Sequence, residues 1–118
     1  MGTFRVPVQV GDPQGSRFEA VEALVDTGAT YTVLPAPLLD RLGIRPDEKR
    51  QFELADDRVI ELDVGMAQIR INGNTYLNIV VFAEEATEPM IGAATLETFG
   101  LAVDPTRKRL VKVPGLLK

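Results

Sequence analysis

Short stretches in which apolar and polar residues alternate run along most of the chain, and this alternation is typical of half-buried β-strands. The predicted strands cover residues 3–10, 17–25, 51–54, 58–64, 67–71, 76–82, 101–103 and 110–113. Residues that favour turns separate them, as in the segment 11–16. Asn72-Gly73-Asn74 predicts a tight hairpin, because Asn-Gly readily adopts positive φ angles. The pattern therefore predicts a mainly β fold.

Two segments have helical spacing instead. Pro35 or Pro37 can open a helix over residues 37–42, which ends before Gly43, and a second helix is predicted over residues 94–99, before Gly100. Each follows an apolar strand end and a glycine-containing loop, which suggests either a duplicated β-rich unit or a chance repeat. The apolar residues expected in the core beneath the helices are Leu38, Leu39, Leu42, Leu96 and Phe99.

Length and composition indicate one globular domain over residues 1–118, with 45% apolar and 25% charged residues. The net charge of −4 argues against a nucleic-acid partner, and the basic cluster at 107–109 is interpreted as a solvated turn. The N-terminus has no pattern of a secretory signal, and no apolar run approaches the roughly 18 residues of a membrane span. We expect a soluble, cytoplasmic protein with no membrane partner.

The chain contains no cysteine and no histidine. This composition excludes disulfides, thiol chemistry, the usual zinc sites and every Ser-His or Cys-His relay. Hydrolytic chemistry would have to come from carboxylates, Lys, Tyr, Ser or Thr, and no cofactor is expected. The adjacent Asp56 and Asp57 lack the spaced oxygen ligands of a calcium loop, which favours a solvated turn over a metal site.

Asp26 is the candidate catalytic residue. It follows the apolar run Ala23-Leu24-Val25 and precedes Thr27-Gly28, so its carboxylate lies where a buried strand meets a turn that glycine makes possible. A charge in such a place costs free energy unless it is paired. The alternative interpretation is a structural aspartate that caps its own turn through the amides of Thr27 and Gly28. A second apolar-apolar-glycine element, Met90-Ile91-Gly92, precedes the second predicted helix.

With these elements the sequence resembles the retropepsin-like aspartic proteases, in particular their stand-alone prokaryotic members. The family pattern has two apolar residues, Asp-Thr-Gly-Ala, two variable residues, Thr-Val-Leu, and a later apolar-apolar-Gly before a helix. Here the pattern reads Leu24-Val25-Asp26-Thr27-Gly28-Ala29, Thr30-Tyr31, Thr32-Val33-Leu34 and Met90-Ile91-Gly92. The resemblance implies a mainly β, retropepsin-like closed barrel of the acid-protease fold with two short helices. It also implies an aspartic endopeptidase.

Because carboxylates hydrolyse peptides as a pair facing one water and this chain has a single motif, the resemblance implies a homodimer. Asp26 of each copy would meet at a two-fold axis. Two such carboxylates cannot both ionise cheaply, so we expect activity at acidic to mildly acidic pH. By resemblance, Thr27 hydrogen-bonds across the axis, and Gly28 lets the substrate backbone approach.

An extended peptide or unfolded protein is the expected substrate. The residues expected to contact it are Ala29, Thr30 and Tyr31 beside the motif, Ala55, Asp56 and Asp57 where the family places its flap, and Ile91. Tyr31 either lines a specificity pocket or packs at the loop edge. Retroviral members often carry an acidic residue at the position of Thr30 and an arginine at the position of Ala93. Their flap tips typically contain glycines, whereas the corresponding tip in this chain is charged and has none. A retropepsin-shaped dimerisation or peptide-binding module that does not cleave is the alternative function.

Overall fold

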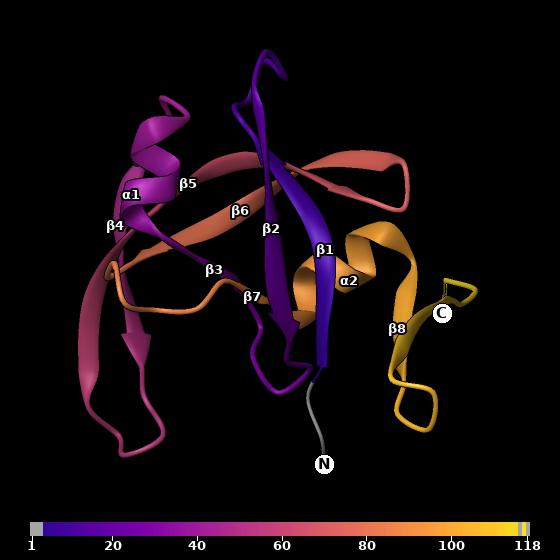
Figure 1. Cartoon of the computed structure of the whole chain (residues 1–118). Coiled ribbons are helices and arrows are strands. Elements are labelled where there is room, and N and C mark those ends of the chain that lie inside the picture. Colours follow the sequence, from indigo (N-terminus) through magenta and orange to yellow (C-terminus); the bar gives the residue numbers. More distant parts are fainter. Residues whose placement is uncertain (1–3, 116, 118) are drawn as a thin grey trace.

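The computed structural model, in which residues 4–115 and 117 are described, consists of nine strands and two short helices in that part of the chain (Figure 1). The elements in chain order are β1 (Phe4–Gly11), β2 (Phe18–Val25), β3 (Thr32–Pro35), α1 (Ala36–Arg41), β4 (Glu48–Glu53), β5 (Val59–Ile71), β6 (Asn74–Ala83), β7 (Met90–Ile91), α2 (Ala93–Phe99), β8 (Leu101–Asp104) and β9 (Arg109–Lys112). The predicted mainly β fold with two short helices is confirmed. Thr3, the first residue of the first predicted strand, lies outside the described residues.

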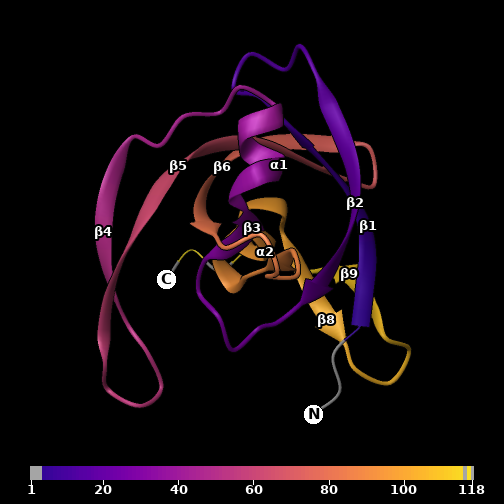
Figure 2. The same cartoon turned by 60° about the vertical axis from the view of Figure 1, so that its left-hand side comes forward.

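Seven strands form one sheet in the order β1-β2-β7-β3-β6-β5-β4, and β1 also pairs with β5, which closes the sheet into a ring. Two hairpins extend beyond this ring. Figure 2 shows the β4–β5 hairpin on one side and the β8–β9 hairpin on the other, and the loop that joins β2 to β3 lies between them in both views. The ring thus presents one loop between two projecting hairpins.

The hydrophobic core fills the ring and the space beneath the helices. Leu38, Leu39, Leu42 and Leu96 are buried as predicted, and Phe99 packs against the same cluster. The inward side chains of the strands complete the core, namely Val8, Val10, Ala23, Leu34, Ile69, Val80 and Ile91. Removal of this apolar surface from water is the main source of stability for a chain without disulfides.

The strand β5 corrects one prediction. The segments 58–64 and 67–71 were predicted as separate strands, but they form one 13-residue strand that continues through Gly65. A Cβ at Gly65 would lie 2.9 Å from the carbonyl oxygen of Arg45 and 3.1 Å from the ring of Phe82. The glycine therefore permits close packing inside a strand rather than ending it.

The hairpin between β5 and β6 confirms the prediction at Asn72 and Gly73. The register pairs Ile71 with Asn74, and the two turn residues have φ angles of 51° and 84°. These are the positive angles that a two-residue hairpin turn needs. Within the described residues, no helix is long and apolar enough to cross a membrane.

Candidate active site

Asp26 directly follows β2, at the point where that strand lies beside β7. The two strands run parallel and pair Leu24 with Met90 and Val25 with Ile91. The pairing continues one step further, because the N–H of Asp26 donates to the carbonyl oxygen of Ile91 at 3.0 Å. The strand end before Asp26 and the apolar-apolar-glycine element at 90–92 therefore lie side by side, and their contact holds the backbone of Asp26.

The carboxylate of Asp26 is half-buried at the start of a tight turn. Its Oδ1 accepts a hydrogen bond from the N–H of Gly28 at 2.9 Å, and its carbonyl oxygen accepts one from the N–H of Ala29 at 3.2 Å. Oδ2 has no hydrogen-bond partner among the described residues. Thr27 and Gly28 are exposed. The turn therefore orients one carboxylate oxygen and leaves the other available to a water or to a second group.

Gly92 brings the start of α2 against the loop that carries Asp26. A Cβ at Gly92 would lie 2.5 Å from the carbonyl oxygen of Tyr31 and 2.7 Å from that of Thr30, so no larger residue fits. The next two amides donate into the loop: the N–H of Ala93 to the oxygen of Ala29 at 2.8 Å, and the N–H of Ala94 to that of Thr30 at 2.9 Å. The loop is held by backbone hydrogen bonds.

A buried pair of threonines also holds the start of α2 against the loop that carries Asp26. The hydroxyls of Thr32 and Thr95 are 2.6 Å apart, and the Thr32 hydroxyl oxygen accepts the N–H of Gly92 at 3.1 Å. Both side chains are almost fully buried, so these bonds satisfy polar groups that water cannot reach. Sequence reasoning missed Thr95, because nothing in the sequence distinguishes it from the neighbouring helix residue Thr98.

The predicted flap is the hairpin of β4 and β5, whose tip holds Ala55, Asp56 and Asp57 in exposed positions. The N–H of Leu54 donates to the oxygen of Arg58 at 2.8 Å and closes the turn. Asp57 has a φ of 68°, and Asp56 forms a salt bridge of 2.7 Å with Arg58. Both charges are well exposed, so the pair contributes little stability. The arrangement agrees with a solvated turn.

The seven residues predicted to contact substrate fall into three places. Ala29, Thr30 and Tyr31 line the loop after Asp26, with Thr30 exposed and the other two half-buried. Ala55, Asp56 and Asp57 lie at the hairpin tip. Ile91 is fully buried in the core, because its short strand β7 lies between β2 and β3. Its side chain is therefore not exposed in this structure, whereas its carbonyl oxygen accepts the N–H of Asp26.

Tyr31 connects the loop to the hairpin. Its ring meets the ring of Phe52 on β4 edge to face, with centroids 5.6 Å apart, and its hydroxyl lies 3.4 Å from Nη1 of Arg50. The hydrogen bond to Glu48 is the larger cause that raises the pKa of Arg50 above its ordinary value, and the hydrogen bond to Tyr31 is the smaller one. The guanidinium therefore stays charged beside the ring. Sequence reasoning singled out neither Phe52 nor Arg50.

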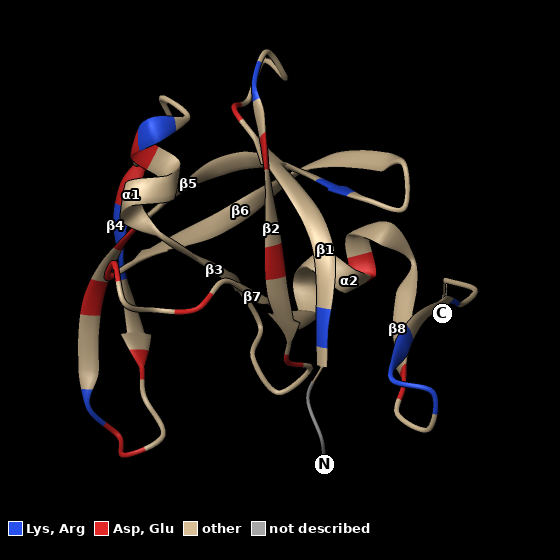
Figure 3. Cartoon of the chain, viewed as in Figure 1, with Lys and Arg blue, Asp and Glu red and all other residues tan. Residues whose placement is uncertain are grey.

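Acidic residues lie in two places beside this region. Figure 3 shows them toward the free end of the β4–β5 hairpin and on the loop after β6. Glu84, Glu85 and Glu88 on that loop are exposed, and Glu88 is paired with Arg5 of β1. These charges lie in solvent, where ion pairs are weak and screened by salt.

The comparisons with known proteins agree with this geometry. The sequence model of the family described as gag-polyprotein putative aspartyl protease matches residues 17–98, well over half of the chain. The chain belongs to this family. The match begins just before β2 and ends inside α2, so it includes every backbone contact that holds Asp26 in this aspartyl-protease chain.

A solved structure supports the same conclusion for the fold. The chain matches EIAV protease complexed with the inhibitor HBY-793 with a TM-score of 0.61, over 84% of this chain and 89% of that chain. The sequence identity is 19%, so this likeness shows the fold alone. The retropepsin-like fold predicted for this aspartyl-protease chain is confirmed. No curated protein matches the sequence.

Proposed function

We propose that the chain is an aspartic endopeptidase in which Asp26 of two copies, brought together at a two-fold axis, activates one water. The observation that carries this proposal is the geometry of Asp26. Its carboxylate stands at an exposed turn on a rigid backbone, with Oδ1 bound to Gly28 and Oδ2 unengaged among the described residues. The match to an aspartyl protease family supports the same chemistry.

The reaction needs two carboxyl groups that share one proton. The ionised one takes a proton from the water as its oxygen attacks the scissile carbonyl carbon. The protonated one gives its proton to the carbonyl oxygen, which yields a tetrahedral diol. When the C–N bond breaks, one carboxyl group protonates the leaving nitrogen and the other takes a proton from the diol. The pair again holds one proton, so activity is expected at acidic to mildly acidic pH.

Two features of the fold support a homodimer. Thr27 and Gly28 are exposed at the tip of the loop of residues 26–31, which we call the catalytic loop, and a second copy can meet them there. The strands β8 and β9 pair only with each other in the described part of the chain. A two-stranded sheet is marginal by itself, and its outer edges can pair with strands of a second copy. An extended peptide would then lie between the catalytic loops and the β4–β5 hairpins.

Replacement of Asp26 by asparagine tests the proposal. Asparagine keeps an oxygen that can accept the hydrogen bond from Gly28, so the fold should persist while the acid and base are lost. We expect cleavage of an unfolded protein, followed from about pH 3.5 to about pH 7, to fall at least about a hundredfold. Asp40→Asn, which removes an exposed carboxylate on α1, is the matched control and should cleave normally.

Equal cleavage by the wild type and Asp26→Asn would show that Asp26 is not the catalyst. No cleavage above background by either protein would favour a retropepsin-shaped module that binds peptides or dimerises without cleaving them. In that case the bond between Gly28 and the carboxylate of Asp26 would be a structural cap of the turn.

A further inference from the structure

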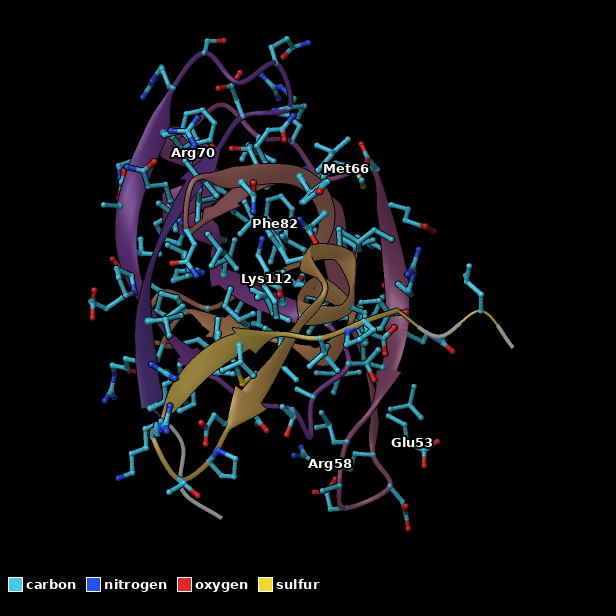
Figure 4. The ribbon with its side chains drawn as sticks, turned by 90° about the vertical axis from the view of Figure 1, so that its right-hand side faces the viewer. Glu53, Arg58, Met66, Arg70, Phe82 and Lys112 are labelled. Carbon is cyan, nitrogen blue, oxygen red and sulfur yellow. The ribbon has the colours of Figure 1, made fainter. Side chains whose placement is uncertain are left out.

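Beyond its base, the β4–β5 hairpin makes few contacts with the rest of the described chain. Within the described residues, β4 pairs only with β5, and the hairpin tip is exposed. Figure 4 shows Glu53 and Arg58 near its free end, away from the rest of the molecule. A projecting hairpin of this kind can tilt about its base as a unit, since its own ladder of hydrogen bonds stays intact from Glu53↔Val59 to Glu48↔Val64.

The contact between Tyr31 and β4 lies part-way along this hairpin. The rings of Tyr31 and Phe52 meet at an interplanar angle of 84°, the edge-to-face geometry that aromatic pairs favour. The guanidinium carbon of Arg50 lies 5.9 Å from the centre of the Tyr31 ring, on the same strand two residues before Phe52. Two side chains of β4 therefore contact one ring of the catalytic loop.

Tyr31 is the fixed member of this contact. Gly92 packs directly against its carbonyl group, and the flanking residues are held as well, because Thr30 accepts the N–H of Ala94 and Thr32 bonds to Thr95. Displacement of Tyr31 would break buried hydrogen bonds, whereas displacement of β4 would not. The backbone that carries the ring is thus held in place, and the hairpin packs against the ring.

We propose that Tyr31 is a positioning residue, which holds the β4–β5 hairpin against the catalytic loop and so sets how readily the hairpin opens to admit a peptide. The inference rests on the proposed function, since it concerns the same site. The hairpin tip has no glycine and is closed by the hydrogen bond from the N–H of Leu54 to the carbonyl oxygen of Arg58. Opening therefore breaks the contact with Tyr31 instead of unfolding the tip.

The first test measures hairpin motion without catalysis. NMR relaxation dispersion of the amides of residues 50–62 in the Asp26→Asn protein reports the open population. Tyr31→Ala should raise that population about threefold to tenfold, the range given by the usual strength of an edge-to-face pair. Tyr31→Phe keeps the ring edge and should stay close to the parent. Tyr76→Ala is the matched control, because Tyr76 forms a similar pair with Phe99 at 5.0 Å, away from the hairpin.

The second test uses the active protein and a fluorescently labelled unfolded casein, whose cleavage gives KM and kcat and whose binding is followed by stopped flow. The contact exists in the closed free protein and in the closed complex, so its loss should change KM and kcat little. Because the peptide enters and leaves only when the hairpin is open, Tyr31→Ala should raise the association and dissociation rate constants together, about threefold to tenfold. Tyr31→Phe should restore both rate constants, and Tyr76→Ala should leave them unchanged.

The two tests separate the two proposals. An unchanged open population in Tyr31→Ala, or an equal increase in Tyr76→Ala, would overturn the role of Tyr31 whatever the activity. If no variant cleaves casein but Tyr31→Ala still frees the hairpin, the proposed function fails and the inference about the hairpin stands. A lower kcat with unchanged KM would place Tyr31 in the chemical step and would also overturn the inference.

Discussion

At the scale of single residues, the position of the one proposed catalytic carboxylate depends on neighbours that do not ionise. Asp26 is held through its own N–H by Ile91 and through Oδ1 by Gly28. The loop beyond it is held by the close approach of Gly92 and by the hydroxyl of Thr32. Backbone contacts of this kind have little freedom to move, so they can keep a reacting group in one orientation.

Gly92→Ala tests how strictly this packing is required. The added Cβ would lie 2.5 Å from the oxygen of Tyr31, and a carbonyl group cannot rotate away as a side chain can. We expect a loss of about 3 kcal/mol or more in the free energy of unfolding, measured by urea denaturation, at the upper end of the cost of overpacking. Gly115→Ala is the control, because nothing lies within 4 Å of its Cβ position. Equal stability of the two variants would contradict the close approach.

The sequence was sufficient to predict positions that depend on a local motif. Asp26 and Gly28 take the positions predicted from the motif and the glycine turn, and the buried leucines follow from helical spacing. The contacts that surround Ile91 and Thr95 were beyond such reasoning. Their surroundings depend on the pairing of β2 with β7 and on the approach of α2, contacts between segments about sixty residues apart that a local pattern cannot specify.

At the scale of elements, local chemistry predicted the turns better than the strand limits. Asn72 and Gly73 dictate their turn through backbone preferences, which act locally. The strand β4 begins at Glu48, three residues earlier than predicted. Its first three residues are all charged and show no apolar alternation, although their backbone pairs with β5. Gly65 suggested a break in β5, but tertiary packing decided otherwise.

The β1–β2 turn gives a prediction on pH. Oδ1 of Asp12 accepts the N–H of Arg17 at 2.7 Å, and Oδ2 accepts the hydroxyl of Ser16 at 2.9 Å. These bonds, the one from Arg17 first, lower the pKa of Asp12 below its ordinary value of 3.8. A lowered pKa stabilises the fold above that ordinary value, and the stabilisation is lost as the pH falls through the folded-state pKa.

Asp12→Ala should therefore lower the urea midpoint at neutral pH and have a smaller effect at about pH 2, because the stabilisation by Asp12 is lost as the pH falls from its ordinary pKa through its folded-state pKa. Urea denaturation of both proteins at the two pH values checks this expectation. Asp40→Ala, which removes an exposed aspartate of α1, controls for the general loss of one negative charge. An equal effect of Asp12→Ala at both pH values would show that the carboxylate is not responsible.

At the scale of the whole molecule, one end of the fold carries the proposed half of a shared catalytic site. The loop after Asp26 lies between the projecting β4–β5 and β8–β9 hairpins, so the same end carries the carboxylate, the proposed substrate cover and strand edges that pair with nothing else in the described part of the chain (Figure 2). A net charge of only −4 opposes self-association weakly. These features suit a closed two-fold pairing in which each copy completes the site of the other.

A mixing experiment tests whether the site is shared. If each active unit needs Asp26 from both copies, a dimer of one wild-type and one Asp26→Asn subunit is inactive. An equal amount of Asp26→Asn, mixed in under conditions that let subunits exchange, should then reduce the activity of a fixed amount of wild type to about half, because random pairing places about half of the wild-type subunits in inactive dimers. A larger excess should reduce it further. Asp40→Asn, which is expected to be active, should add activity in the same assay. If Asp26→Asn has no effect although sedimentation shows mixed dimers, each subunit acts alone and the shared pair of carboxylates is excluded.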